Sequence, residues 1–219
     1  MTDRDLQAPY RRPAGATEVI LVRHGSSLAA EDDRVPLGGQ ADPSLSSLGE
    51  SQAKAVGRLL GGLDPSSTSL FVTNLRRTVQ TAQPTADALG LTPIVVSDLR
   101  EICLGEYEGA AFETRRRAGD PLLHRVFAEE RWDLLPGAES MPSFGARVRR
   151  GLASLVECVP PESTAVAFVH GGVIAEVCRH ITDSRAFAFV DVENGSVTRL
   201  THHNDRTWRL RSFNDTAHL

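Results

Sequence analysis

The sequence TEVILVRHG, residues 17–25, gives the strongest indication of how this chain folds. Residues 17–22 form a short, mostly apolar run with β-branched side chains, which is typical of a strand buried on both faces of a sheet. Arg23, His24 and Gly25 follow directly, so polar side chains stand where this strand is expected to end. The stretch therefore predicts a central strand that delivers an arginine and a histidine to one edge of a sheet.

Further short apolar runs follow along the chain, and segments with helical periodicity separate them. The expected strands lie at residues 70–72, 93–96, 165–169, about 196–200 and about 208–211. The expected helices cover residues 47–60, 75–89, 144–156 and a segment through Ile174 and Cys178. Ser46 or Ser47 is the expected cap of the first helix. Strands that alternate with helices predict the α/β class, here a three-layer α/β/α sandwich with a largely parallel central sheet.

The chain has 219 residues, a length that favours one domain over two independent ones. We expect residues 1–15 to form a flexible tail and residues 16–219 to form the domain. Residues 100–140 mix charge runs with Gly and Pro, and we assign them to a lid or insertion region. No run reaches the length of a membrane span, and the N-terminal segment lacks the apolar stretch of a signal peptide. We therefore expect no membrane partner and a cytoplasmic location.

The charged residues and cysteines exclude further classes. Lys and Arg total 24 against 28 acidic residues, a formal charge of -4, whereas nucleic-acid-binding domains usually carry a basic surplus. Lys54 is the only lysine, and for most of the arginines a compositional bias is the simpler explanation. Cys103, Cys158 and Cys178 include no C-x-x-C pair, which argues against a disulfide framework or a Cys-rich zinc site. We expect no nucleic-acid partner.

Three of the predicted strands end in residues that suit a bound anion. Arg23 and His24 follow the first strand, the second runs into a helix that carries Arg77, and His170 follows the fourth. Taken singly, each of these residues also has a simpler explanation than a functional one. The histidines could be hydrogen-bonded structural residues, and the arginines could be solvated. Because ligands in such folds bind at the carboxyl ends of the strands, where helix N-termini also point N–H groups, we expect one phosphate site. A metal site is the rival use of two histidines, but no clustered third ligand is apparent, and arginine would repel a cation.

The same residues resemble the histidine phosphatase superfamily, the group that includes cofactor-dependent phosphoglycerate mutase. The similarity extends from about residue 17 to about residue 200 and comprises six blocks in the family's order. The blocks lie at residues 21–25, 45–53, 73–82, 99–101 with 105–109, 136–140 and 168–172. Glycine after His170 is similar to the branch that holds the mutases and many small bacterial phosphatases. The resemblance therefore implies a phosphoglycerate mutase-like fold.

The resemblance also implies a role for each site residue. His24 would attack the phosphoryl group and form a phosphohistidine, so its imidazole must be neutral, with its other nitrogen donating to a fixed acceptor. Glu101 would protonate the leaving group, although Glu106 and Glu108 are nearby alternatives. The phosphate-binding residues implied are Arg23, Arg77 rather than Arg76, His170 and Ser27. No metal and no cofactor is implied, because the arginines supply the positive charge.

The sequence departs from the family's pattern in places. Leu28, Ala29 and Ala30 stand where the family often has an asparagine, which puts one phosphate or substrate contact in doubt. Residues 115–117 form a triple arginine, which is either a solvated helix face or a site for a second phosphate or a carboxylate of the substrate.

The family's mutases hold their bisphosphate intermediate with a longer lid that includes an Arg-Arg-Ser-Tyr segment, and this chain lacks that segment. We therefore expect a metal-independent phosphomonoesterase that acts on a small phosphorylated metabolite. The alternatives are a phosphoglycerate mutase-type phosphoryl transfer and a pseudo-enzyme that only binds phosphorylated ligands. Retention of His24, Arg77, Glu101 and His170 argues against the pseudo-enzyme. A small phosphorylated substrate is the expected partner, and the resemblance leaves a homodimer open.

Overall fold

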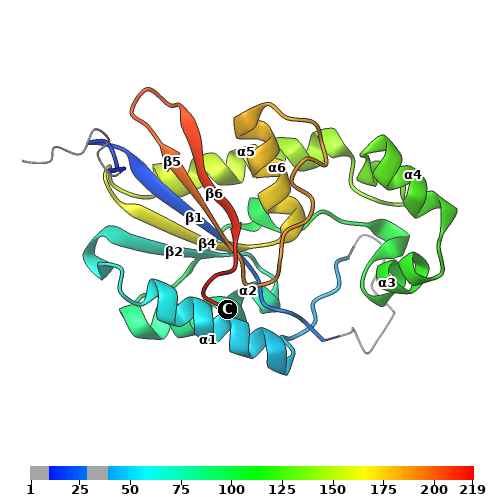
Figure 1. Ribbon diagram of the computed structural model, residues 1–219, viewed down its shortest axis with the longest axis horizontal. Helices are drawn as coiled ribbons and strands as arrows, with labels where there is room; N and C mark the ends of the chain where they lie inside the picture. The colour runs from blue at the N-terminus through cyan, green and yellow to red at the C-terminus, as the bar shows by residue number, and fades with distance from the viewer. Residues whose placement is uncertain (1–9, 29–38) are drawn as a thin grey trace, which may run out of the picture.

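The computed structural model describes residues 10–28 and 39–219, and these residues contain a six-stranded sheet (Figure 1). The strands are β1 (Thr17–Arg23), β2 (Thr68–Val72), β3 (Ile94–Val95), β4 (Thr164–Val169), β5 (Val197–His202) and β6 (Trp208–Asp215). Their order across the sheet is β3-β2-β4-β1-β5-β6. β1 to β4 are parallel, whereas β5 runs antiparallel to β1 and β6 antiparallel to β5. The sheet is therefore largely parallel, as the sequence predicts.

In the described part of the chain, four helices cover the two faces of this sheet (Figure 1). One face carries α1 (Ser47–Leu60) and α2 (Arg76–Leu89), and the other carries α5 (Met141–Glu157) and α6 (Gly171–Thr182). Ser46 rather than Ser47 caps α1, because the Ser46 side-chain oxygen accepts a hydrogen bond from the Gly49 N–H. The three-layer α/β/α sandwich expected from the sequence is confirmed.

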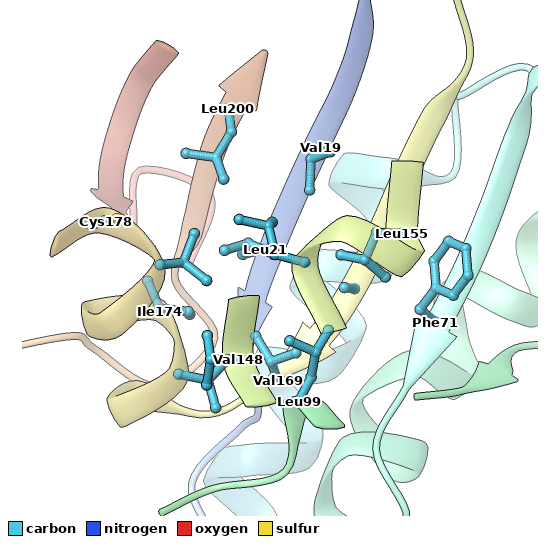
Figure 2. Close-up of a cluster of buried hydrophobic side chains, with 14 of the residues drawn as sticks. Val19, Leu21, Phe71, Leu99, Val148, Leu155, Val169, Ile174, Cys178 and Leu200 are labelled. Carbon is cyan, nitrogen blue, oxygen red and sulfur yellow. The ribbon is translucent and has the colours of Figure 1, made fainter. Parts of the chain in front are cut away.

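The apolar side chains of β1 alternate between two cores. Val19 and Leu21 pack with side chains of α5 and α6, as Figure 2 shows. Ile20 and Val22 point to the opposite face and pack with side chains of α1 and α2. Each of the four is at most 1% exposed, and burial of one such side chain contributes about 1.5–3 kcal/mol. β1 is therefore the strand buried on both faces that residues 17–22 predict.

Residues 105–135 form a small substructure beside the carboxyl ends of the parallel strands (Figure 1). It contains η3 (Gly105–Tyr107), α3 (Ala110–Arg117), α4 (Pro121–Glu129) and η4 (Trp132–Leu134), where η denotes a 3₁₀ turn. Its own core consists of Tyr107, Leu123, Val126 and Leu135. The sequence of residues 100–140 shows no sustained helical periodicity because these helices are short. They form a small core of their own beside the core of the sheet. Two further 3₁₀ turns, η1 (Pro65–Ser67) and η2 (Ser97–Leu99), lie before β2 and after β3.

Residues 10–15 contact the domain, although the sequence places them in a flexible tail. The Arg12 guanidinium donates a hydrogen bond from Nη1 to the backbone oxygen of Ser163, directly before β4, at 3.1 Å. Whether residues 10–15 are flexible, as the sequence predicts, stays a prediction. Residues 1–9, the remainder of that expected tail, lie outside the described residues.

The N-terminus of α1 lies directly against the backbone that follows β1. The Ser46 N–H donates to the carbonyl oxygen of Ser26 at 2.8 Å, and the Ser46 hydroxyl donates to the same oxygen at 3.1 Å. A Cβ atom added to Gly49 would overlap this Ser26 oxygen. Because Ser26 is two residues from His24, the absence of a side chain at position 49 sets how closely α1 approaches the end of β1.

Replacement of Gly49 by alanine is expected to lower the free energy of unfolding by about 1–3 kcal/mol, because the backbone must move to accept the methyl group. Gly62→Ala is the matched control. No atom lies within 4 Å of a Cβ at position 62, so its effect should stay within about 0.5 kcal/mol. Urea denaturation of both variants measures the difference. A G49A variant as stable as the parent would contradict the close approach.

Candidate active site

The predicted site residues gather at the carboxyl ends of β1, β2 and β4. A cavity of about 590 Å³ opens there. Its lining includes five of the six predicted residues: Arg23, His24, Ser27, Arg77 and Glu101. His170, the sixth, follows β4 as the N-cap of α6 and is fully buried. Its ring packs edge-on against that of His24, with the centroids 5.2 Å apart, so all six positions lie together.

The two ring nitrogens of His24 have different partners. Nδ1 lies 2.8 Å from the carbonyl oxygen of Gly25, and Nε2 lies 3.2 Å from Nε of Arg77. Because a carbonyl oxygen only accepts and a guanidinium only donates, the proton is on Nδ1 and the free electron pair is on Nε2. Burial, together with the positive charges of Arg77 and Arg23, lowers the pKa of His24 well below its ordinary 6.5. The imidazole is therefore neutral at neutral pH.

Arg77 is oriented by both ends of its guanidinium group. It lies in the first turn of α2 and is 8% exposed. Its Nε donates to His24, and its Nη1 donates to the carbonyl oxygen of Ala41 at 2.8 Å. The neighbouring Arg76 is exposed and contacts Asp42 instead. The structure therefore places Arg77, and not Arg76, at the cavity.

Arg23 brings a second guanidinium to the same place. One of its terminal nitrogens, Nη1, donates to the carbonyl oxygen of Val192. Its Nε is buried and has no hydrogen-bond partner among the residues that the structure describes. Burial lowers the pKa of Arg23, and the negative charges of Glu101 and Glu193 partly offset this effect. A buried N–H without a partner destabilises a protein by about 1–3 kcal/mol, so this donor suits a bound anion.

His170 is held through one nitrogen only. Its Nε2 lies 3.0 Å from the hydroxyl oxygen of Thr73, the residue that follows β2. Its Nδ1 is buried and has no partner within residues 10–28 and 39–219. Burial, with the charge of Arg77 as the next contribution, lowers the pKa of His170 well below 6.5. Thr73 is not among the site residues predicted from the sequence, and the structure makes it the partner of this histidine.

The carboxylate of Glu101 accepts hydrogen bonds from two backbone groups. Oε1 accepts from the Ile102 N–H at 3.0 Å, and Oε2 accepts from the Gly172 N–H at 3.1 Å. Gly172 is the second residue of α6, so the carboxylate lies at the positive end of that helix. A Cβ atom at position 172 would lie 2.5 Å from Oε1 of Glu101. The absence of a side chain at position 172 thus makes room for a carboxylate of this chain.

Residues 19–216 match the family described as the histidine phosphatase superfamily (branch 1). The chain belongs to this superfamily. The resemblance drawn from the six sequence blocks is therefore confirmed.

Individual relatives in the superfamily carry both mutase and phosphatase names. A probable phosphoglycerate mutase of Yersinia enterocolitica is 28% identical over 208 residues, which are 92% of this chain and 94% of that protein. The solved mycobacterial glucosyl-3-phosphoglycerate phosphatase is 28% identical with a TM-score of 0.75, covering 92% of this chain and 100% of its own. A phosphoglycerate mutase of Bacillus anthracis, 20% identical with a TM-score of 0.75, shows similarity of fold alone. The phosphoglycerate mutase-like fold is confirmed.

A buried ion pair behind the cavity holds the segment that carries Glu101. Arg147 of α5 is 5% exposed and forms two hydrogen bonds to the Glu139 carboxylate, at 2.8 and 2.7 Å. It also donates to the carbonyl oxygens of Asp98 at 2.9 Å and Glu101 at 2.8 Å. Sequence reasoning missed Arg147. The available signal was its position three residues after Phe144, on the apolar stripe of the predicted helix, where a charged residue needs a partner.

The two glutamates considered as alternatives to Glu101 lie in different environments. Glu106 is exposed, whereas Glu108 lines the cavity. The Glu108 carboxylate accepts from the Leu104 N–H at 2.7 Å and from the Ala41 N–H at 3.3 Å. Burial raises the pKa of Glu108 above its ordinary value. Of the two alternatives, only Glu108 is thus placed where it can affect the site.

The cavity wall contains the position at which the sequence departs from the superfamily pattern. Ser27 lies in this wall, and its backbone pairs with Leu45 in an isolated β-bridge. Leu28, which stands near the place of the family's asparagine, also lines the cavity and is 53% exposed. Ala29 and Ala30 lie outside the described residues. An apolar side chain therefore occupies part of this wall.

The triple arginine lies on α3, at the mouth of the cavity. The Arg115 guanidinium stacks over the ring of Tyr107, 4.1 Å from its centroid. Arg116 and Arg117 both pair with Glu113, at 2.8 and 2.7 Å. Of the three arginines, Arg117 alone lines the cavity. Arg116 is exposed and away from the cavity, as the simpler interpretation of a solvated helix face predicts, whereas Arg115 is half-buried against Tyr107.

Within residues 10–28 and 39–219, no three His, Cys, Asp or Glu side chains come close enough to hold a metal ion together. In the same part of the chain, no helix is both long and apolar enough to cross a membrane. Cys103, Cys158 and Cys178 are free thiols.

Removal of the Arg77 charge is expected to raise the pKa of His24 toward 6.5, because that charge disfavours the imidazolium form. In the parent, the His24 ring should stay neutral well below pH 6.5. In an Arg77→Met variant the ring should take up its second proton at a higher pH. Any activity that needs neutral His24 should then begin to fall at a higher pH as the solution is acidified. NMR titration of the His24 ring measures this. Arg76→Met is the control, and an R77M titration identical to the parent's would refute the coupling.

Proposed function

We propose that this chain is a metal-independent phosphomonoesterase that acts on a small phosphorylated metabolite and forms a phosphohistidine at His24. The observation that carries the proposal is the state of the His24 ring. Its Nε2 carries no proton and accepts a hydrogen bond from Nε of Arg77 at 3.2 Å, in a residue that lines the cavity. A neutral imidazole nitrogen is a nucleophile, and a guanidinium beside it attracts a phosphoryl group to the attacking atom.

In the first step, Nε2 of His24 attacks phosphorus in line with the ester oxygen. The N–P bond forms as the P–O bond to the leaving group breaks, and Glu101 gives a proton to the leaving alkoxide. Arg23, Arg77 and His170 hold the non-bridging oxygens and offset their charge. Two buried groups without partners among the described residues can donate to the phosphoryl oxygens. They are Nε of Arg23 and Nδ1 of His170, the latter in the tautomer whose Nε2 accepts from the Thr73 hydroxyl.

In the second step, water replaces the substrate alcohol. Glu101, now a carboxylate, takes a proton from this water as it attacks phosphorus, and the N–P bond breaks. Phosphate leaves, and His24 regains its neutral ring with the proton on Nδ1. The hydrogen bonds from Ile102 and Gly172 hold Glu101 in one place through both steps.

The cavity lining favours hydrolysis over mutase-type transfer. A mutase must retain a bisphosphate while it reorients, which needs cations beyond those that hold one phosphoryl group. Apart from Arg23 and Arg77, the described lining offers Arg117, and this guanidinium is already paired with Glu113. Mutase activity is the second candidate, because the relative from Yersinia enterocolitica carries that name.

The cavity also indicates the size of the substrate. Its volume of about 590 Å³ lies within the range of sites for small organic molecules, so a phosphate group fills only part of it. Leu28, Pro43, Leu104 and Phe112 contribute apolar surface to the remainder. We therefore propose an organic phosphomonoester with a partly apolar group next to the phosphate.

The test is a panel of phosphomonoesters assayed in EDTA, including p-nitrophenyl phosphate and 3-phosphoglycerate. We expect phosphate release that EDTA does not reduce, and a loss of at least about a thousandfold in the His24→Ala variant, because the nucleophile is removed. Conversion of 3-phosphoglycerate to 2-phosphoglycerate, without net phosphate release, would instead establish the mutase. Strict dependence on a divalent metal, or binding without turnover across the panel, would contradict the proposal.

A further inference from the structure

We infer that Glu108 is a positioning residue for Arg77, and that it acts through the backbone of Ala41. This inference rests on the proposed function, because it concerns the guanidinium that would hold the phosphoryl group. Glu108 is not proposed to touch the reacting atoms. It instead holds in place the Ala41 carbonyl oxygen, which is the acceptor that orients Arg77.

The contacts form a continuous chain from Glu108 to the nucleophile. Oε2 of Glu108 accepts a hydrogen bond from the Ala41 N–H at 3.3 Å. The Ala41 carbonyl oxygen accepts from Nη1 of Arg77 at 2.8 Å, and Nε of Arg77 donates to Nε2 of His24 at 3.2 Å. Each link is a single hydrogen bond, so displacement of Ala41 removes the contact that holds the far end of the Arg77 guanidinium.

The two ends of this chain differ in how firmly they are held. The backbone around Glu108 is fixed, since its N–H donates to Gly105 at 3.2 Å and the preceding Tyr107 is 2% exposed. The other carboxylate oxygen of Glu108 accepts from the Leu104 N–H at 2.7 Å, which sets the orientation of the side chain. Residues 39–44, by contrast, belong to no helix or strand. Glu108 therefore ties Ala41, which lies outside the regular elements, to the more firmly held backbone around η3.

The negative charge of Glu108 favours the charged form of Arg77, in addition to the hydrogen bonds that Glu108 accepts. Burial lowers the pKa of Arg77, and the negative charges of Glu101, Asp42 and Glu108 counter that effect. A buried guanidinium is thus stabilised by a carboxylate that it does not contact. A neutral glutamine at position 108 would remove this charge and leave one of the two backbone N–H groups facing an amide N–H₂ instead of an acceptor.

The experiment is a double-mutant cycle on the affinity for inorganic phosphate, measured by calorimetry with Glu108→Gln, Arg77→Met and the double variant. We expect E108Q to weaken phosphate binding about tenfold, in the range of a lost charge-assisted hydrogen bond. In the R77M background the same change should have less than about a twofold effect, because the residue through which it acts is gone. A purely structural role would give equal effects in both backgrounds.

Glu106→Gln is the matched control, because Glu106 is exposed and lies two residues away in the same segment. It should bind phosphate as the parent does. Thermal melts establish that each variant folds. If E108Q does not fold, Glu108→Asp replaces it in the cycle, since it keeps the charge but is too short to reach both N–H groups. Additive effects, or unchanged affinity in a folded E108Q or E108D variant, overturn the inference.

Failure of the proposed function can be told apart from failure of this inference. If the parent neither binds phosphate nor turns over any ester, the proposed function fails, and the ¹⁵N resonance of His24 Nε2 then reports the Arg77 contact without a ligand. A shift of that resonance in E108Q but not in E106Q supports the positioning role. No shift in E108Q overturns it.

Discussion

The hydrogen bond from Nδ1 of His24 to the carbonyl oxygen of Gly25, 2.8 Å long, is the contact on which the site depends. It fixes the ring tautomer and therefore leaves the electron pair on Nε2. The fold keeps this acceptor in place from several directions. The Gly25 N–H donates to the Thr81 hydroxyl of α2 at 3.0 Å, and Asn194 donates to the His24 carbonyl oxygen at 2.9 Å. The central position of β1 between β4 and β5 fixes the backbone that leads into this turn.

The second constraint is the concentration of positive charge around a buried neutral ring. Arg23 and Arg77 both lower the pKa of His24, and burial lowers their own pKa values in turn. Glu101 and Glu108 line the same cavity, and their negative charges partly offset the lowering of the Arg77 pKa. The unpartnered Nε of Arg23 shows that the described protein groups do not use all of the donors that these arginines offer. Such an arrangement is preorganised for an anion, since its donors need little rearrangement when one binds.

Much of the fold and of the site could be predicted from the sequence, because both depend on local patterns. The run at residues 17–22 predicts the central strand, and polar residues at three strand ends predict where the cavity lies. Arg147, Thr73 and the link from Glu108 to Arg77 could not be predicted in this way. Each acts through a hydrogen bond to a residue distant in sequence, and such partners follow from how strands and loops pack. The contacts of residues 10–15 could not be predicted either, because a polar segment without periodicity gives no indication of the residues that it contacts.

In the proposed mechanism, Nε2 of His24 carries the phosphoryl group during turnover. The most direct measurement is a rapid alkaline quench during hydrolysis of p-nitrophenyl phosphate, followed by peptide mass spectrometry and ³¹P NMR of the modified histidine. We expect a phosphoryl group on His24, attached to Nε2, that forms and decays at rates compatible with turnover. Phosphorylation of His170 in its place, or turnover with His24 unmodified at every time point, would contradict it.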